Sequence, residues 1–160
     1  MQFEPLDTSK HDRKSFDCGV EALNLYLSRY VNQDQKRSVT RCHVLSDGGR
    51  IIGYFTLAGH SVTRENLPES RKLGIYEDIP FLLLGRLAVD KEFQGKGYGD
   101  ALLYHAFRLT KDAAKAYGIY GIIVEAKNEE AALFYQGFGF KPLKGQALKL
   151  VLPLSAVNTD

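Results

Sequence analysis

Three glycines in five positions stand in the middle of the chain, within Gln94-Gly95-Lys96-Gly97-Tyr98-Gly99. The apolar run FLLLGRLAV precedes them, and apolar residues at helical spacing follow. Glycine lets the backbone turn sharply and approach a ligand closely. The first amides of a helix lack intrahelical acceptors and lie at the positive end of the helix dipole. The pattern therefore predicts a pyrophosphate site, with Lys96 as an added cation. The alternative is a tight strand–helix turn that binds nothing.

Two common phosphate-binding motifs do not fit this stretch. A P-loop needs Ser or Thr after its Gly-Lys pair, and here Gly97 follows Lys96. The dinucleotide fingerprint G-x-G-x-x-G needs a different glycine spacing and a place after the first strand of the chain. The ligand is therefore expected to be neither a P-loop nucleotide nor a dinucleotide.

A mixed α/β order of elements is expected to position this loop. After Phe16, Asp17 is expected to cap a helix that runs to about Gln35. A hairpin follows over 41–62 around Asp47-Gly48-Gly49, with Gly53 and Gly59 as possible bulge positions. A long polar connection over 63–80 then leads to a buried strand over 81–89. Past the glycines we expect a helix ending at 118, a buried strand over 119–126, a short helix and a last strand over 146–152.

Length and composition indicate one soluble globular domain. The chain has 160 residues, 44% hydrophobic and 25% charged, and a net charge of +2, so any basic function must be local. The first residues do not read as a signal peptide, and the run FLLL is far shorter than a membrane span of about 20 residues. Cys18 and Cys42 indicate reduced thiols in a cytoplasmic protein, with a disulfide or a catalytic thiol as the alternatives. The four histidines lack metal-ligand spacing, so no metal is expected.

Two motifs resemble the signatures of the GCN5-related N-acetyltransferases (GNAT family). Gln94-x-x-Gly97-x-Gly99 is similar to that family's acetyl-CoA pyrophosphate loop, Gln/Arg-x-x-Gly-x-Gly/Ala. The stretch NEEAALFYQGFGF resembles the second signature, with Asn128, Tyr135 and a Gly-Phe pair. The resemblance implies one GNAT domain over 1–160, with a mixed central β-sheet, a splayed strand pair and flanking helices.

The resemblance also implies the cofactor, acetyl-CoA, and a set of site residues. The implied cofactor-binding residues are Leu87, Ala88, Val89, Gln94, Gly95, Lys96, Gly97, Tyr98, Gly99, Asp100 and Asn128. Tyr135 is implied as the general acid, because a phenol of pKa near 10 can protonate a departing thiolate at neutral pH. The Val89 amide is a further candidate, as an oxyanion donor. The simpler alternatives are a helix cap for Asn128 and a core position for Tyr135, which recurs at helical spacing with Ala131 and Phe138.

A closer resemblance narrows the amine substrate. FDCGVEALNLYL, GYFTLAG, LLGRLAVDKEFQGKGYGDALL and FYQGFGF together resemble the acetyltransferase toxins of type II toxin–antitoxin systems. This implies acetylation of the amino acid on aminoacyl-tRNA, a block of translation, a ribbon-helix-helix antitoxin, a homodimer and a cytoplasmic location. Tyr104, His105 and Asn128 stand where the family more often has acidic residues, which leaves fine specificity open. The alternatives are an acetyltransferase for a small-molecule or protein amine and a non-enzymatic CoA-binding regulator.

Positive charge gives modest support for a nucleic-acid substrate. Lys36, Arg37 and Arg41 form a local basic cluster that suits phosphate contacts, although ordinary solvated charge is equally consistent. Arg86 differs, because it stands on an apolar strand and a buried arginine needs a partner. That partner is an internal carboxylate such as Glu125, or else substrate or cofactor.

Overall fold

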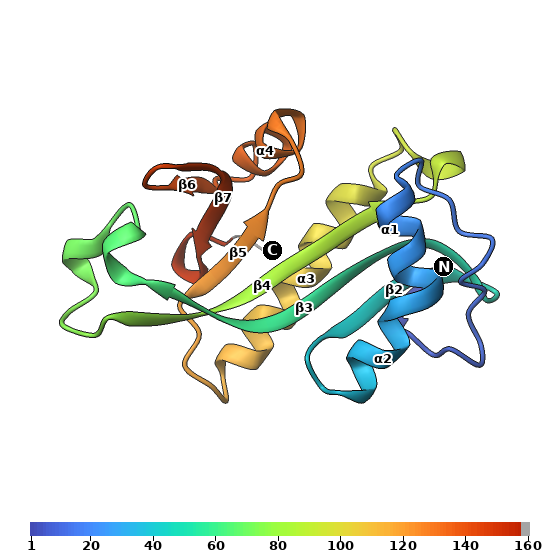
Figure 1. Ribbon diagram of the computed structural model, residues 1–160, viewed down its shortest axis with the longest axis horizontal. Coiled ribbons are helices and arrows are strands. Elements are labelled where there is room, and N and C mark those ends of the chain that lie inside the picture. Colours follow the sequence, from blue (N-terminus) through green and yellow to red (C-terminus); the bar gives the residue numbers. More distant parts are fainter. Residues whose placement is uncertain (158–160) are drawn as a thin grey trace. The chain divides into compact units, whose positions relative to one another are not determined.

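The computed structural model describes residues 1–157 (Figure 1). The strands are β1 (Gln2–Pro5), β2 (Arg41–Asp47), β3 (Arg50–Thr63), β4 (Asp78–Val89), β5 (Gly121–Glu125), β6 (Lys141–Leu143) and β7 (Gln146–Pro153). The helices are α1 (Glu21–Leu25), α2 (Val31–Lys36), α3 (Tyr98–Ala114) and α4 (Glu129–Gln136), and the π-helical turn Tyr26–Tyr30 joins α1 to α2. The chain divides into two compact units: Met1–Ala58 with Gly85–Ala106, and Gly59–Leu84 with the described residues from Phe107 onward.

The strands follow the order β1-β2-β3-β4-β5-β7-β6 in a seven-stranded mixed sheet. β4 and β5 are parallel, whereas β2 is antiparallel to β1 and β3, and β7 is antiparallel to β5 and β6. The expected mixed α/β class is therefore confirmed. The expected hairpin is also present, and its turn glycines Gly48 and Gly49 have φ of 57° and 93°. The register of the hairpin shifts between Leu45 and Ser46, opposite Gly53, which agrees with the expected irregularity there.

The parallel ladder between β4 and β5 is short. Its described pairs run from Phe81↔Gly121 to Leu84↔Val124. β4 nevertheless continues to Val89, so its last residues have no described partner in β5. The expected splayed strand pair corresponds to this loss of pairing between β4 and β5 after Leu84.

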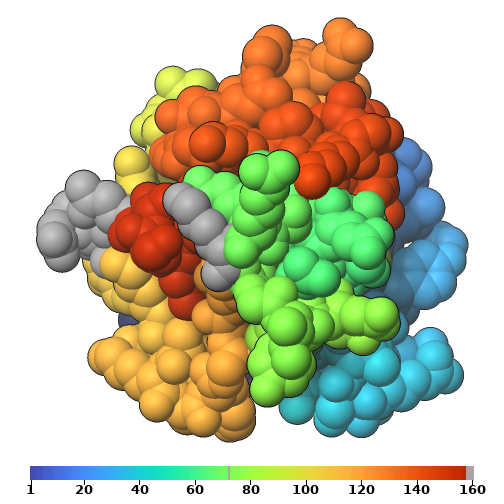
Figure 2. Space-filling view, turned by 90° about the vertical axis from the view of Figure 1, so that its left-hand side faces the viewer, coloured from blue at the N-terminus to red at the C-terminus, as the bar shows by residue number. Residues whose placement is uncertain are grey.

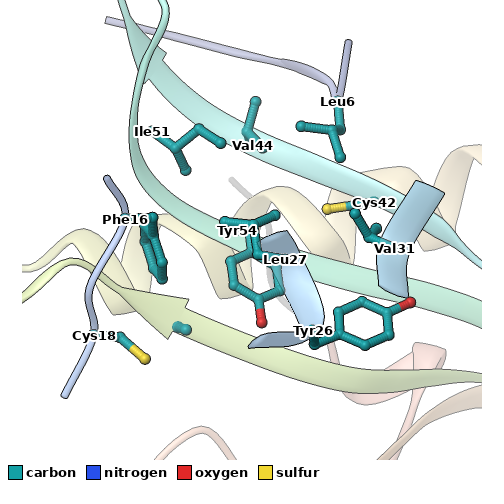
Figure 3. Close-up of a cluster of buried hydrophobic side chains, with 11 residues drawn as sticks. Leu6, Phe16, Cys18, Tyr26, Leu27, Val31, Cys42, Val44, Ile51 and Tyr54 are labelled. Atoms are coloured by element: carbon teal, nitrogen blue, oxygen red, sulfur yellow. The ribbon is translucent and has the colours of Figure 1, made fainter. Parts of the chain in front are cut away.

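The first unit has a core between its strands and the helical segment 21–36 (Figure 3). Leu27 and Val31 are fully buried on the helical side, and Val44 and Tyr54 pack against them from β2 and β3. The Tyr54 hydroxyl donates a hydrogen bond of 2.7 Å to the Leu23 carbonyl. The helical segment is therefore fixed to one face of these strands.

The first half of α3 covers the opposite face of the same strands. A Cβ atom at Gly53 would lie 2.6 Å from the Leu102 side chain, and the Phe55 and His105 rings are 6.0 Å apart. Side chains alternate along a strand, so Gly53 and Phe55 face away from Tyr54. The glycine loop thus leads into the helix on one face, whereas segment 21–36 lies on the other.

The second unit has its own core. Val62, Phe81, Ile123 and Val151 pack together from four strands, with Leu67 from the β3–β4 connection. That connection, drawn in green, lies against the orange-to-red β6–β7 segment in Figure 2. Its own regular structure is limited to two 3-10 turns, at 64–66 and 70–72.

The expected helix cap at Asp17 is wrong. α1 begins at Glu21 after Val20, which makes no side-chain cap. The Asp17 carboxylate instead accepts from the Gly19 amide and the Asn24 side chain, both at 2.9 Å, and pairs with Lys91 at 2.9 Å. These contacts hold the turn that precedes the helix.

Two strands and one helix end also differ from expectation. The short strands β1 and β6 were not expected, because each depends on pairing with a distant strand rather than on its own residue pattern. α3 ends at Ala114, before the expected Gly118. Residues 115 and 116 continue as a turn, and the Tyr117 amide is bonded to the Ala113 carbonyl at 3.0 Å.

Candidate active site

The glycine loop has the backbone conformation that its composition predicts. Gly95 and Gly97 have φ of 76° and 88°, values that side-chain-bearing residues rarely adopt. A Cβ atom at either position would meet nothing within 4 Å, so the backbone is open to a ligand on that side. The Ala101 amide donates to the Gly97 carbonyl at 3.1 Å. The amides before Ala101 therefore belong to the first turn, whose donors are free for an anion.

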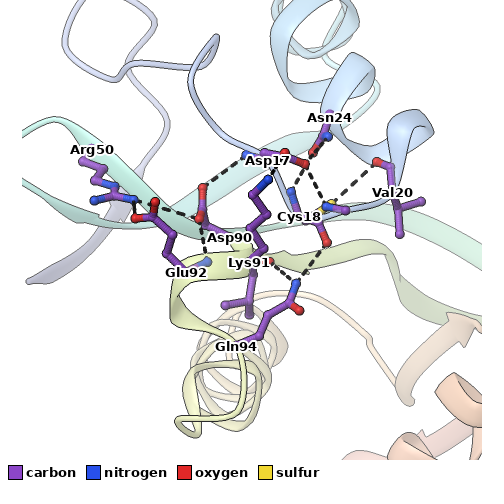
Figure 4. Close-up of polar contacts among 11 residues, drawn as sticks. Asp17, Cys18, Val20, Asn24, Arg50, Asp90, Lys91, Glu92 and Gln94 are labelled. Carbon is purple, nitrogen blue, oxygen red and sulfur yellow. Dashed lines mark hydrogen bonds and ion pairs between the residues drawn. The ribbon is translucent and has the colours of Figure 1, made fainter.

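A polar network fixes the entry of this loop to the N-terminal segment (Figure 4). Asp90 is 4% exposed, and its carboxylate accepts from the amides of Asp17 (3.1 Å) and Glu92 (3.0 Å). The Lys91 amide donates to the Asp17 carbonyl at 2.8 Å, and hydrogen bonding to the Lys91 side chain lowers the pKa of Asp17 to about 2. The loop thus starts from a rigid point.

The Gln94 side chain takes part in this network. Its Nε2 donates to the carbonyls of Cys18 and Val89, both at 2.9 Å. These bonds use the donors of the side-chain amide, which leaves an oxygen that cannot bind an anion. Gln94 therefore positions the loop, and only its backbone amide remains suited to the cofactor role expected of it.

Two cations share an aromatic ring beside the loop. The Lys96 Nζ lies 5.7 Å from the Phe93 ring centroid, and the Arg50 guanidinium lies 4.8 Å from it. Arg50 also pairs with Glu92, whereas Lys96 is exposed and forms no ion pair within residues 1–157. Lys96 therefore adds positive potential next to the open amides.

The expected strand residues Leu87, Ala88 and Val89 form the end of β4 that extends past the parallel ladder. Ala88 is buried in the core of the first unit, and the Val89 carbonyl accepts from Gln94. These residues, the loop and Asp100 all belong to the first unit. Asn128 and Tyr135 belong to the second unit.

Asn128 caps α4 as expected. Its Oδ1 accepts from the Ala131 amide at 2.8 Å, and Glu129 and Glu130 occupy the first turn. Asn128 is exposed, so its amide nitrogen remains available to a ligand. The cap and the expected contact with the cofactor arm are therefore compatible.

Tyr135 combines a buried ring with an accessible hydroxyl. The side chain is 8% exposed and packs edge-on against Phe134 (5.2 Å) and Phe140 (5.5 Å). Its hydroxyl bonds to no described residue, and no fully buried polar side-chain atom in the described chain lacks a partner. The hydroxyl oxygen must therefore reach the surface. Burial raises the pKa of Tyr135 to about 12, so the phenol stays protonated at neutral pH.

The residues of the basic cluster at the end of α2 are exposed, but they differ in their hydrogen bonds. Lys36 ends α2 and Arg37 follows it, and neither forms an ion pair with a described residue. The Arg41 Nη1 donates to the carbonyls of Gln35 (2.8 Å) and Thr40 (3.3 Å). Arg41 therefore stabilises the end of α2, whereas Lys36 and Arg37 are free to contact phosphates.

Arg86 lies on an aromatic platform rather than on a carboxylate. Its guanidinium carbon is 3.4 Å from the centroid of the Tyr26 ring, and the Tyr26 hydroxyl donates to Asp34 at 2.8 Å. No carboxylate of the first unit forms an ion pair with Arg86 in the described chain. Glu125, the internal partner considered from the sequence, belongs to the other unit.

Sequence reasoning missed Asp90 and Tyr26. Asp90 follows the strand directly, and its place between a buried strand and a glycine loop was the available signal. Tyr26 offered no signal, because its contact with Arg86 joins segments far apart in the chain. Cys18 and Cys42 are buried and form no disulfide in the described chain, and burial raises the pKa of the Cys42 thiol to about 12, which argues against a nucleophile there.

The fold and the glycine loop together indicate a class of enzyme. The acetyltransferase (GNAT) domain family matches residues 38–142, more than half of the chain. The chain belongs to this family, and the expected GNAT fold is confirmed. Within residues 1–157, no helix combines the length and hydrophobicity needed to cross a bilayer.

Particular relatives narrow the class. A tRNA-acetylating toxin of Mycobacterium tuberculosis is 34% identical over 141 residues, which cover 88% of this chain and 85% of that protein. The structure of AtaT complexed with acetyl-methionyl-tRNAfMet matches with a TM-score of 0.90 and 36% identity, over 97% of this chain and 95% of that one. A tyrosine-to-phenylalanine variant of the toxin AtaT, bound to the C-terminus of the antitoxin AtaR and acetyl-CoA, matches with a TM-score of 0.84 and 34% identity over 97% and 94%.

Proposed function

We propose that this protein transfers the acetyl group of acetyl-CoA to the amino group of aminoacyl-tRNA and acts as a translation-blocking toxin. The observation that carries the proposal is the likeness to AtaT in complex with an acetylated aminoacyl-tRNA, which extends over 97% of the chain. The open glycine cradle adds support from the chain itself, because an acetyl-CoA pyrophosphate needs such a site.

In this proposal the first unit holds acetyl-CoA, which supplies an activated acetyl group as a thioester. The amides of Gly95 to Asp100 bind the pyrophosphate, with Lys96 as the nearby cation. The backbone of Leu87 to Val89 binds the pantetheine arm, because β4 has no described partner in β5 there. Asn128 offers its amide nitrogen to the same arm.

Tyr135 is proposed as the general acid. The amine nitrogen attacks the thioester carbonyl carbon, the C–S bond breaks, and the sulfur leaves with the electron pair. The Tyr135 hydroxyl gives its proton to that sulfur, and the proton lost by the amine replaces it through water. The protonated phenol and its accessible oxygen suit this role. A free amine of pKa near 8 is partly neutral at pH 7, so no strong base is required.

The RNA is proposed to contact the basic cluster of Lys36, Arg37 and Arg41. Lys36 and Arg37 are exposed and unpaired within the described chain, as phosphate contacts require. Arg41 adds charge while it holds the end of α2.

We further propose that the chain forms one functional domain over 1–160 in the cytoplasm, pairs as a homodimer and is neutralised by a ribbon-helix-helix antitoxin. The complex of AtaT with the antitoxin AtaR supports an antitoxin partner. An adjacent reading frame for a small ribbon-helix-helix protein would test the pairing.

The decisive experiment is incubation with labelled acetyl-CoA and bulk charged tRNA. We expect label on charged tRNA, none on deacylated tRNA, and none on charged tRNA whose amino group is already blocked. Label on polyamines or protein amines but not on charged tRNA would overturn the proposal in favour of another acetyltransferase.

A further inference from the structure

Arg86 is a half-buried cation, and no residue that the structure describes accepts a hydrogen bond from its side chain. Its guanidinium forms no hydrogen bond and no ion pair with any residue in 1–157. No fully buried side-chain nitrogen in the described chain lacks a partner, so the nitrogens of Arg86 open to the surface. A guanidinium carries five N–H donors in one plane, and they remain available here.

The Tyr26 ring fixes the direction in which these donors point. The ring lies against the guanidinium at 3.4 Å, and Tyr26 is only 6% exposed. The bond from the Tyr26 hydroxyl to Asp34 holds the ring in place from α2. A ligand must therefore approach the guanidinium at its edge, where two parallel N–H groups match the oxygens of a phosphate.

Arg86 lies on the face of β4 opposite to the helix that the cofactor loop enters. Side chains alternate along a strand, so Arg86 shares a face with Ala88, which is buried with Tyr26 and Leu27. That face is covered by segment 21–36, whereas α3 covers the other face of the first unit. An anion on Arg86 is therefore separate from the pyrophosphate bound by the loop.

Positive charge continues along the segment that covers this face. Arg29, Lys36 and Arg37 are exposed on segment 21–37. None of them forms an ion pair with a described residue. Tyr26, which contacts Arg86, lies on the same segment, so these charges and Arg86 suit a single polyanion.

We propose that Arg86 binds a phosphodiester at the 3′ end of the tRNA substrate, with Tyr26 as the platform that orients it. The inference rests on the proposed function, because aminoacyl-tRNA supplies the second anion. Tyr26 is thus a positioning residue, and Arg86 contacts substrate.

The test compares an amine substrate that carries phosphodiesters with one that carries none. One is an aminoacylated CCA oligonucleotide, and the other is the same amino acid esterified to adenosine. For Arg86→Gln we expect kcat/KM to fall about 10- to 100-fold on the oligonucleotide, as for loss of a charge-assisted contact, and to stay unchanged on aminoacyl-adenosine. Arg86→Lys should be intermediate, because it keeps the charge and loses the fork. Arg108→Gln, an exposed arginine on α3, is the matched control and should have no effect.

A binding measurement without acetyl transfer separates this inference from the proposed function. Deacylated CCA-ended RNA should bind Arg86→Gln more weakly, with a shallower salt dependence, whereas acetyl-CoA affinity stays constant. Tyr26→Phe keeps the ring and should bind nearly as wild type, whereas Tyr26→Leu should resemble Arg86→Gln. Equal losses on both amine substrates, an unchanged salt slope, or loss of acetyl-CoA binding would each overturn the role of Arg86. Failure of the wild type to acetylate charged tRNA would overturn the proposed function alone.

Discussion

Removal of the Tyr135 hydroxyl tests the chemistry with little effect on packing. In Tyr135→Phe the ring keeps its edge-on contacts with Phe134 and Phe140. The hydroxyl bonds to no described residue, so the substitution costs no hydrogen bond within this part of the chain. We expect the free energy of unfolding to change by no more than about 0.5 kcal/mol.

The expected loss of turnover follows from the pKa of Tyr135. General acid catalysis contributes about 10²–10⁴-fold. Burial raises the pKa of Tyr135 to about 12, whereas a thiol has a pKa of about 8.5, so the phenol is the weaker acid. The effect should therefore lie toward the lower end of that range, with unchanged affinity for acetyl-CoA, because the hydroxyl acts mainly in the transition state.

The pH profile adds a second readout. Because the folded pKa is raised, Tyr135 is protonated from acid pH up to about 11, and any role as an acid is lost only above that. The wild-type rate should rise toward pH 8 as the substrate amine loses its proton, with no decline due to Tyr135 below pH of about 10.

The role of Tyr135 is tested by measuring steady-state acetyl transfer, acetyl-CoA affinity and thermal unfolding on one preparation. Tyr120→Phe is the matched control, because Tyr120 packs on Phe81 away from α4 and its loss of hydroxyl should leave turnover intact. A Tyr135→Phe protein with wild-type turnover would remove this residue from the mechanism.

Two further predictions concern the ligands. Gly97→Val adds a branched side chain at φ of 88°, in the open space above the cradle, and should weaken acetyl-CoA binding severely; calorimetric titration of the folded variant checks this, and unchanged affinity would refute the loop assignment. Lys36→Gln with Arg37→Gln should weaken tRNA binding and lower its salt slope by about 1–2, since each phosphate contact contributes about 0.7–0.9. Acetyl-CoA affinity should be unaffected, and an unaltered slope would mark the two as plain surface charges.

Local features of the site could be predicted from the sequence, because local chemistry determines them. Gly95 and Gly97 adopt the positive φ that only glycine adopts readily, and Asn128 caps its own helix. α3 likewise follows from residue periodicity, the hairpin from its turn residues, and the strand over 81–89 from its apolar run.

The remaining features depend on partners far along the chain. Asp17 has a good capping side chain, but Lys91 and the turn at Gly19 occupy it. The Gln94 side chain fits a phosphate-loop pattern, yet it bonds to the Cys18 carbonyl and therefore positions the loop. The sequence pattern indicates the residue type at such positions, but it does not indicate which distant residue that side chain will bond to.

Asp90 connects the two anion sites proposed for the first unit, and its replacement should affect both. It joins the cofactor loop to Asp17, and the segment that follows Asp17 carries the Tyr26 platform. Asp90→Ala leaves two amides without an acceptor, at about 1–3 kcal/mol each, so we expect a lower Tm and weaker binding of both acetyl-CoA and RNA. Asp112→Asn is the control, because Asp112 belongs to an exposed ion pair with Lys115. It should change neither the Tm nor the binding of either ligand. Arg86→Gln and Gly97→Val each affect one ligand, so a single-ligand effect in Asp90→Ala would show that the two sites do not depend on this common anchor.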